Sequence, residues 1–284
     1  MANKYIQDLF TANHFFGDVE CCPDVSAVDR DIAILSINDS TKSVESLLEL
    51  RKLKKLKVAS IKTDVLPILA QLQQLELLCI QFCSKGFEVL SPLGSLSNLK
   101  CLILDSLRQP SSIEFLTRLK KLRGLEIQNL RQVRDLSPIS KLTNLQELKI
   151  ETGGMLSGQL AMDTLQPLAA LKKLEYLWLF VLSKDSSLEP LSHLKKLKKL
   201  LINGLYPWQE YPKLKASLPK TNCEWFEKRI IEWGLTCSRC GEPAKVGLVG
   251  KGARKACSIC QPKKVEEWIA AYEAEFEKAR SGQW

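Results

Sequence analysis

Residues 133–150 read VRDLSPISKLTNLQELKI, and the leucine spacing of this stretch recurs through the middle of the chain. Leu142, Leu145, Leu148 and Ile150 follow the pattern L-x-x-L-x-x-L-x-L, whose last position also accepts Ile or Val. Six further copies have their third leucine at positions 56, 78, 102, 125, 177 and 200. Successive third leucines lie 22, 24, 23, 23, 29 and 23 residues apart. A pattern repeated at such even spacing predicts a solenoid of stacked units.

The end of each copy, L-x-L, predicts a short β-strand. Alternate strand residues point to opposite faces, so Leu125 and Ile127 would face a core while Glu126 faces outward. Each copy buries its leucines only against its neighbours, so the stack shares one continuous core. Proline recurs ten residues before the third leucine, at Pro92, Pro138, Pro167 and Pro190. Proline suits the first turn of a short helix, and Ser91 and Ser137 are expected to cap two of these turns.

The leucine pattern resembles the leucine-rich-repeat family, and residues 133–150 resemble the short repeats of bacterial internalins. The resemblance covers about residues 44–205 and implies an α/β solenoid with a parallel sheet on its concave face. The family usually has Asn or Cys five residues after the third leucine, where it satisfies backbone groups at a turn. Here that column reads Ile61, Cys83, Leu107, Leu130, Gly153, Leu182 and Leu205. The turns of this chain must therefore satisfy their backbone groups in another way.

The extent of the repeats divides the chain into three segments. Residues 1–43 are expected to form an N-terminal cap, because the end of a solenoid exposes its core. Within them, residues 31–37 (DIAILSI) predict an additional first strand. Residues 44–219 hold the solenoid of about seven repeats, and residues 220–284 form a C-terminal module. The long step between the fifth and sixth copies contains TGGMLSGQLAMD, whose glycines predict a loop.

The outward strand positions would form the concave face, and two groups there are unusual for a solvated surface. The first is a row of aromatic side chains on one strand: Tyr176, Trp178 and Phe180. The second is an apolar patch on two neighbouring strands: Leu77, Cys79, Cys101 and Ile103. Exposed apolar patches mark interaction sites, and aromatic residues are common anchors of protein interfaces. Either these residues bind a partner protein, or another part of the chain covers them.

The chain is basic, with 41 Lys+Arg against 32 Asp+Glu and a formal net charge of +9. Basic pairs recur between the first two leucines of several copies: Arg51-Lys52, Lys120-Lys121, Lys172-Lys173 and Lys195-Lys196. These pairs would line one edge of the solenoid. They either form a solvated surface or contact phosphate groups, in which case binding would weaken steeply with salt.

Four cysteines near the C-terminus, Cys237, Cys240, Cys257 and Cys260, have the spacing C-x2-C-x16-C-x2-C. This spacing predicts a structural Zn²⁺ site with four thiolate ligands, in a module resembling a zinc ribbon. Four thiolates close the coordination, so such a zinc has no open position for catalysis. The alternative is a redox-active CxxC, but neither pair lies in the strand–helix context typical of thioredoxin-like proteins.

The residues between the cysteine pairs, KVGLVGKGARK, predict a short hairpin that turns at Gly250 and Gly252. Gly241 suits a tight turn after the first pair. Residues 237–264 hold seven basic residues and one acidic residue. If this module binds nucleic acid, the contacts would be Lys245, Lys251, Arg254 and Lys255. Otherwise the metal has only a structural role, cross-linking a module that is too small to form a hydrophobic core of its own.

Two helices are predicted beside the zinc module. Thr221 and Glu224 match a capping box, and Phe226, Ile230 and Trp233 follow at helical spacing. The second helix has an apolar stripe after the last cysteine, comprising Val265, Trp268, Ile269, Tyr272 and Phe276. It is expected to pack on the module or on the solenoid end, or else to bind a partner helix.

The sequence argues against two classes of protein, enzymes and membrane proteins. It contains two histidines, His14 and His193, and no P-loop, G-x-S-x-G, H-E-x-x-H or G-x-G-x-x-G before a helix, so no enzyme is expected. It contains no run of 18 apolar residues and no secretion signal, so we expect no membrane association and a cytoplasmic location. The ten cysteines would stay reduced there.

These features favour a bacterial, non-enzymatic protein that binds a partner protein on its concave face. Leucine-rich-repeat proteins of this size often act by occluding another protein, so the resemblance implies an inhibitor or an immunity protein against a toxin. The alternative is a nucleic-acid-associated protein that uses the basic zinc ribbon and the lysine edge. A third hypothesis is a structural subunit of a larger assembly.

Overall fold

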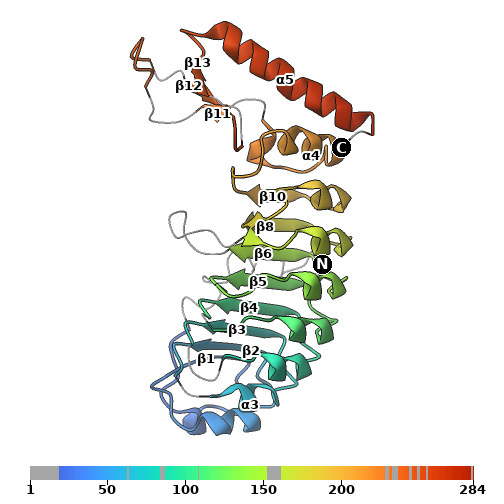
Figure 1. Cartoon of the computed structure of the whole chain (residues 1–284). Coiled ribbons are helices and arrows are strands. Elements are labelled where there is room, and N and C mark those ends of the chain that lie inside the picture. The colour runs from blue at the N-terminus through green and yellow to red at the C-terminus, as the bar shows by residue number, and fades with distance from the viewer. Residues whose placement is uncertain are drawn as a thin grey trace.

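The computed structural model describes residues 19–62, 64–83, 87–107, 109–151, 161–227, 230–231, 236–242, 245–247, 250–253, 255–282 and 284. These residues form a curved solenoid with a small module at its C-terminal end (Figure 1). Strands lie along one side of the solenoid and short helical turns along the other. The α/β solenoid predicted from the leucine pattern is confirmed.

Eight strands of the described residues form one parallel sheet, in chain order. They are β1 (Ile34–Asn38), β2 (Lys55–Ala59), β3 (Leu77–Gln81), β4 (Cys101–Asp105), β5 (Gly124–Gln128), β6 (Glu147–Glu151), β8 (Tyr176–Phe180) and β10 (Lys199–Ile202). Strands β2, β3, β4, β5, β6, β8 and β10 contain the L-x-L ends of the seven copies, and β1 is the predicted additional strand, shifted by a few residues. A second, two-stranded sheet pairs β7 (Ala161–Met162) with β9 (Leu182–Ser183). Residues 152–160 of the predicted insertion loop lie outside the described residues.

The register of the sheet keeps equivalent leucines beside one another. Leu125 of β5 pairs with Leu148 of β6, and Leu148 pairs with Leu177 of β8. All three side chains are fully buried. Complete burial of a leucine contributes about 1.5–3 kcal/mol, so the columns of leucines between repeats are the main source of the solenoid's stability.

Short helical turns line the opposite side of the solenoid. They are η1 (Val25–Ala27), η2 (Val44–Glu49), α3 (Leu66–Leu69), η3 (Ser91–Ser95), η4 (Glu114–Arg118), η5 (Ser137–Lys141), η6 (Gln166–Ala170) and η7 (Glu189–His193). The four predicted prolines all occupy the first turn of their helix. The expected serine caps are wrong, because Ser91 and Ser137 are themselves the first helical residues. Asp135 instead accepts hydrogen bonds from the Ser137 hydroxyl and N–H, which lower the pKa of Asp135.

Backbone hydrogen bonds between repeats replace the missing asparagine column. The residue after several strands adopts a positive φ, namely 57° at Ser60, 56° at Phe82, 56° at Ser106 and 54° at Asn129. In this conformation its N–H points to the next repeat. Ser106 N–H donates to the Gln128 carbonyl at 3.0 Å, and Asn129 N–H donates to the Glu151 carbonyl at 2.8 Å. The usual asparagine position is therefore free to hold apolar side chains such as Leu107, which is fully buried.

Helices α4 (Glu210–Ser217) and η8 (Glu224–Phe226) follow the last strand of the solenoid. α4 packs against η7 and against the final helix, α5 (Pro262–Arg280). The module itself contains an antiparallel sheet of β11 (Ile230–Ile231), β12 (Lys245–Gly247) and β13 (Lys255–Cys257). The predicted hairpin between the cysteine pairs and the predicted final helix are both confirmed.

The helix predicted after Thr221 is wrong. The Thr221 hydroxyl donates to the Leu197 carbonyl at 2.7 Å, so this residue is tied to the last repeat and does not cap a helix. η8 is a single 3₁₀ turn without a side-chain cap. Ile230 lies in β11, where it pairs with Gly247. Trp233 lies outside the described residues.

Helix α5 closes the C-terminal end of the molecule. Its predicted stripe is buried at Val265 and Tyr272 and half-buried at Trp268, Ile269 and Phe276. The Tyr272 hydroxyl donates to the Phe226 carbonyl at 2.8 Å, which ties α5 to η8. α5 also contacts α4 and β13, so it packs on both the solenoid end and the module. Within the part of the chain that the structure describes, no helix has the length and apolarity needed to span a bilayer.

The turn between β12 and β13 attaches the module to the solenoid. Lys251 N–H donates to the Tyr206 carbonyl at 2.7 Å, and Trp208 N–H donates to the Lys251 carbonyl at 3.2 Å. Gly250, at φ 105°, approaches the same segment so closely that a Cβ there would lie 2.7 Å from the Cα of Trp208. Only glycine fits this position without displacing the backbone, so the predicted turn glycine is also a docking residue.

Candidate functional site

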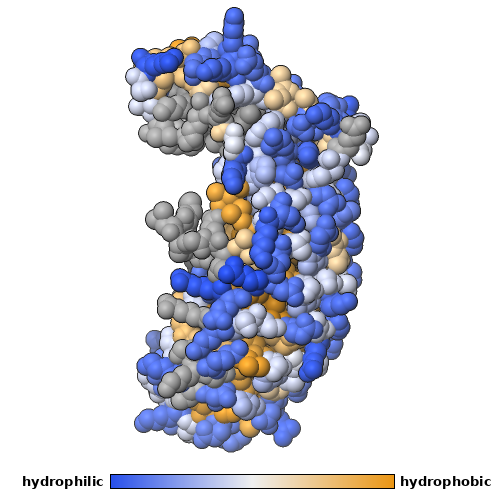
Figure 2. Space-filling view, viewed as in Figure 1, coloured by the Kyte–Doolittle hydropathy of each residue, from blue (hydrophilic) through white to orange (hydrophobic). Residues whose placement is uncertain are grey.

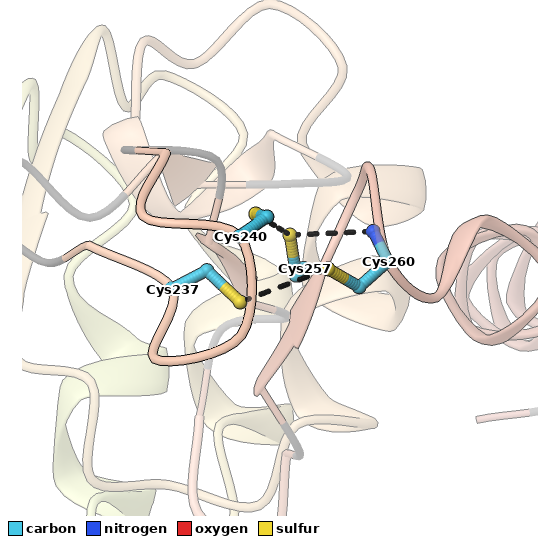
Figure 3. A group of neighbouring side chains, drawn as sticks. All are labelled: Cys237, Cys240, Cys257 and Cys260. Atoms are coloured by element: carbon cyan, nitrogen blue, oxygen red, sulfur yellow. Dashed lines mark hydrogen bonds between the residues drawn. The ribbon is translucent and has the colours of Figure 1, made fainter.

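The four cysteines of the C-terminal module converge on one point (Figure 3). Cys237 and Cys240 lie in the turn before β12, Cys257 ends β13, and Cys260 lies in the turn before α5. The Sγ atoms are 3.9 Å apart for Cys237 and Cys260 and 3.7 Å apart for Cys240 and Cys257. All four Sγ atoms lie within 4.8 Å of one another, and all four thiols are free.

Backbone N–H groups hold the thiols in place. Arg239 N–H donates to Sγ of Cys237, and Cys260 N–H donates to Sγ of Cys257, each at 3.4 Å. The N–H groups of Arg239 and Cys240 lower the pKa of Cys237 to about 6. Gly241 has a φ of 73°, and its N–H donates to the Cys237 carbonyl at 2.8 Å, which closes the predicted tight turn.

The donor set fits a tetrahedral metal ion. Zinc bound at about 2.3 Å to four sulfurs places those sulfurs about 3.8 Å apart, close to the distances between the paired thiols. A disulfide would need the paired sulfurs at about 2.05 Å. The four cysteines therefore form a cluster compatible with a metal centre, and such a centre would join the two turns to β13 and to the start of α5.

The basic residues expected to contact nucleic acid are only partly described. Lys251 is exposed, and its backbone lies against Tyr206 and Trp208. Lys245 and Lys255 lie in β12 and β13, but their side chains are outside the described part of the structure, as is Arg254. Of the four predicted contacts, only Lys251 therefore has a described side chain.

The aromatic row lies on β8, as predicted. Tyr176, Trp178 and Phe180 are all half-buried on the outward side of the strand. The rings of Trp178 and Phe180 are 5.3 Å apart with a tilt of 38°. Trp178 pairs in register with Lys149 of β6, whose Nζ lies 4.9 Å from the indole centroid. This geometry is a cation–π contact.

The apolar patch does not form an exposed surface. Leu77 is 1% exposed and Ile103 is 2% exposed, and they form a closed cluster with Cys79 and Cys101, against which Ile34 packs. The expectation that Leu77 and Ile103 offer a free binding surface is therefore corrected. Alternation along a strand predicts which side of the sheet a residue faces, but not what covers that side.

The sequence reasoning missed an ionic cluster beside the aromatic row. Lys149 Nζ lies 3.1 Å from a carboxylate oxygen of Glu126, which also accepts a hydrogen bond from Gln128. Glu126 is 3% exposed, so desolvation raises its pKa while Lys149 opposes the rise. The signal was present in the repeat spacing, which places Glu126, Lys149 and Trp178 side by side on three strands.

Comparisons with known proteins agree with the repeat architecture. The family model described as a leucine-rich repeat region matches residues 31–221. No curated protein matches the chain. Among solved structures, internalin C2 of Listeria monocytogenes is 27% identical, with a TM-score of 0.47, over 61% of this chain and 74% of its own. A leucine-rich-repeat protein of Leptospira interrogans is 18% identical, with a TM-score of 0.48, over 75% of this chain and 56% of its own.

The matched family region begins just before β1 and ends after the last strand of the parallel sheet. It therefore contains every strand of the solenoid and excludes the four-cysteine module. Solenoids of this kind present an extended concave surface to protein partners, and they typically carry no catalytic centre. The chain belongs to the leucine-rich-repeat family.

Proposed function

We propose that the chain is a non-enzymatic binding protein that holds a partner protein on the concave face of its solenoid, around Tyr176, Trp178 and Phe180. The observation that carries this proposal is the half-buried aromatic row on β8. Large aromatic side chains with restricted motion are the commonest energetic anchors of protein interfaces. In the view of Figure 2, hydrophobic residues lie beside strongly hydrophilic ones at the level of β8 and β10.

The neighbouring charges support the same assignment. Lys149 fixes the indole of Trp178 from one side and is itself held by Glu126 and, more distantly, by Glu151 at 3.9 Å. An anchor whose rotamer is already fixed loses little entropy when a partner binds. Binding that occludes the partner would make the protein an inhibitor, and an immunity protein against a toxin is the specific form of this proposal. We place it in the bacterial cytoplasm, where the ten cysteines stay reduced.

The four-cysteine cluster is proposed to hold one structural Zn²⁺. The residues that would bind it are Cys237, Cys240, Cys257 and Cys260. Bound zinc would supply a closed cross-link with no open position for substrate. Its role in this proposal is to keep the module folded against the last repeat. The alternative function is nucleic-acid binding by this module. Of the four residues predicted to make that contact, only Lys251 has a described side chain.

The test is affinity capture with the tagged protein from native lysate, with and without nuclease, followed by mass spectrometry. A stoichiometric protein that survives nuclease is then titrated against wild type, Trp178→Ala and Trp284→Ala. Trp284 is a matched control, since it is a partly exposed tryptophan at the far end of the chain. Trp178→Ala should weaken binding roughly tenfold or more, as for a hot-spot residue, while Trp284→Ala should not. Equal affinities of all three proteins would exclude the aromatic row as the binding site.

A further inference from the structure

A basic cavity lies at the edge of the sheet where strands β4, β5, β6 and β8 begin. Its volume is about 330 Å³. Its lining consists of Lys100, Lys121, Arg123, Asn144, Gln146 and Lys173. Four of these six side chains are cationic and two are amides, and no carboxylate of the described residues lines the cavity. The cavity thus gathers two lysines of the predicted lysine edge with cations from the neighbouring position of the repeat.

Asparagines hold two of the lysines without cancelling their charge. Lys121 Nζ donates to Oδ1 of Asn98, and Lys173 Nζ donates to Oδ1 of Asn144, both at 2.7 Å. Each asparagine is fixed in turn, because its Nδ2 donates to a backbone carbonyl of the preceding repeat at 2.9 and 3.0 Å. A neutral amide orients an ammonium group but leaves its full positive charge available.

Two other lysines of this edge are paired with carboxylates. Lys100 lies 2.6 Å from Glu76, and Lys198 lies 2.6 Å from Glu175. Glu76 thus neutralises Lys100 at one end of the cavity, and Glu175 neutralises Lys198, which lies outside the cavity beyond its other end. The uncompensated lysines, Lys121 and Lys173, belong to repeats two strand intervals apart, so the strongly positive region is about 10 Å long.

We propose that this cavity binds a compact anion that carries at least two phosphate groups, either a free short phosphate chain or the phosphate chain of a nucleotide. Lys121 and Lys173 would contact the two ends of the anion. Arg123 would supply the planar donor geometry that matches phosphate oxygens, with Asn144 and Gln146 as neutral donors between. A long polymer such as RNA fits less well, because the flanking carboxylates interrupt the positive track.

This site is separate from the aromatic row of β8, so it does not depend on the proposed protein partner. The experiment uses the full chain and isothermal titration calorimetry at low ionic strength, with tripolyphosphate as the probe. We expect one binding site per chain and much weaker binding of inorganic sulfate, which cannot span the two lysines. Absence of tripolyphosphate binding to the wild-type chain would overturn the proposal.

Three variants decide where the probe binds. Lys121→Gln with Lys173→Gln should lower the affinity by roughly tenfold or more per lysine, since a hydrogen bond to a charged group is lost at each end. Lys121→Arg with Lys173→Arg keeps the charge and should retain most of the affinity. Lys198→Gln removes one charge from the same edge outside the cavity and should leave the affinity within about twofold. An equal loss in Lys198→Gln would mean diffuse attraction to the edge and would refute a defined site. Thermal melts by circular dichroism establish that all variants remain folded.

Two further ligands separate the sources of the anion. ATP that binds as tripolyphosphate does, with the same dependence on Lys121 and Lys173, would indicate recognition of the phosphate chain alone. ATP that binds more tightly would indicate a nucleotide. A single-stranded RNA that binds more tightly than either, and that also loses affinity in Lys198→Gln, would replace the compact anion with a nucleic-acid track.

Discussion

The ammonium group of Lys149 lies over the indole ring of Trp178, 4.9 Å from its centroid, and 3.1 Å from the carboxylate of Glu126. The side chains of Lys149 and Glu126 are 16% and 4% exposed, so these charges interact largely out of water. One lysine thus balances a buried carboxylate on β5 and orients an aromatic ring on β8. Stability and the geometry of the proposed binding surface are therefore coupled at Lys149.

Lys149→Met should destabilise the chain by about 3 kcal/mol at neutral pH, because Glu126 is left buried without its counter-charge. Urea denaturation at pH 7 measures the free energy of unfolding. The matched control is Lys149→Met with Glu126→Gln, which removes both charges and should recover most of the loss. A double variant as unstable as the single one would show that lost packing, and not the unpaired carboxylate, is responsible.

The pH dependence of the Lys149→Met variant has a definite sign. Burial raises the pKa of Glu126 in the folded chain, and the loss of Lys149 raises it further. A carboxyl whose folded pKa is raised contributes most stability below its unfolded pKa and loses that contribution as the pH rises through the folded pKa. The deficit of the variant should therefore shrink as the pH falls from about 7 towards about 5. A constant deficit across this range would contradict the assignment to Glu126.

Metal content tests the four-cysteine cluster. Wild-type protein should contain one zinc per chain by elemental analysis, and Cys257→Ser should lose it, because the cluster has no spare thiol. Protease should then cleave the C-terminal module of the variant while the solenoid persists. Cys21→Ser alters an exposed cysteine far from the cluster and should keep the metal. Wild-type protein without zinc, or a Cys257→Ser variant with a full complement, would exclude the site.

The attachment of the module is tested by a pair of glycine variants. Gly250→Ala places a methyl group within 2.8 Å of Trp208, Tyr211 and Tyr206 and should release the module. Gly252→Ala also has a positive φ, 84°, but meets nothing within 4 Å, so it should cost only about 1 kcal/mol of backbone strain. Hydrogen exchange at Lys251 and Trp208 reports the attachment directly. Similar exchange rates in both variants would show that backbone strain alone explains the effect.

Phe82→Asn should stabilise the solenoid slightly. Phe82 adopts a φ of 56° and is 59% exposed, so it carries backbone strain with little burial in return. Asparagine tolerates this conformation, and the gain should be about 0.5–1 kcal/mol. Thermal denaturation measures the gain, and Asn129, which already has this residue type at the same position of its repeat, shows that the backbone accepts it. A loss of stability would indicate that the Phe82 ring packs more closely than its exposure implies.

The parts of the fold that depend on periodicity could be predicted from the sequence. The leucine columns predicted the seven strands β2, β3, β4, β5, β6, β8 and β10, because each repeat contacts only its neighbours and the spacing therefore reports the contacts directly. The short strands β7 and β9 lie outside these columns and were not predicted. The cysteine spacing likewise predicted the cluster of Cys237, Cys240, Cys257 and Cys260. In both cases the spacing of the residues along the sequence directly implies which of them meet in the folded chain.

Other features depend on contacts that no local pattern contains. Leu77 and Ile103 read as exposed strand positions, but they are buried in the folded chain. Thr221 matched a capping box, yet its hydroxyl binds a carbonyl 24 residues away. The basic cavity could not be identified from the lysine pairs alone. The net positive charge of each lysine there depends on whether a neighbouring repeat pairs it with an asparagine or with a glutamate. Each of these three features involves a residue whose partner belongs to a different repeat or module.

The hydrogen bonds of Lys251 with Tyr206 and Trp208 have a consequence for the lifetime of the whole surface. In a linear array, opening at one end separates a single interface, whereas opening in the middle must separate two. Fraying therefore starts at the terminal repeat, and β10 lies next to β8, which carries the aromatic row. The hydrogen bonds between the module and the segment after β10 therefore hold the last strand in place and slow its separation from the sheet. Loss of these hydrogen bonds would shorten the time for which Trp178 stays in place, even though the described contacts include none between the module and Trp178.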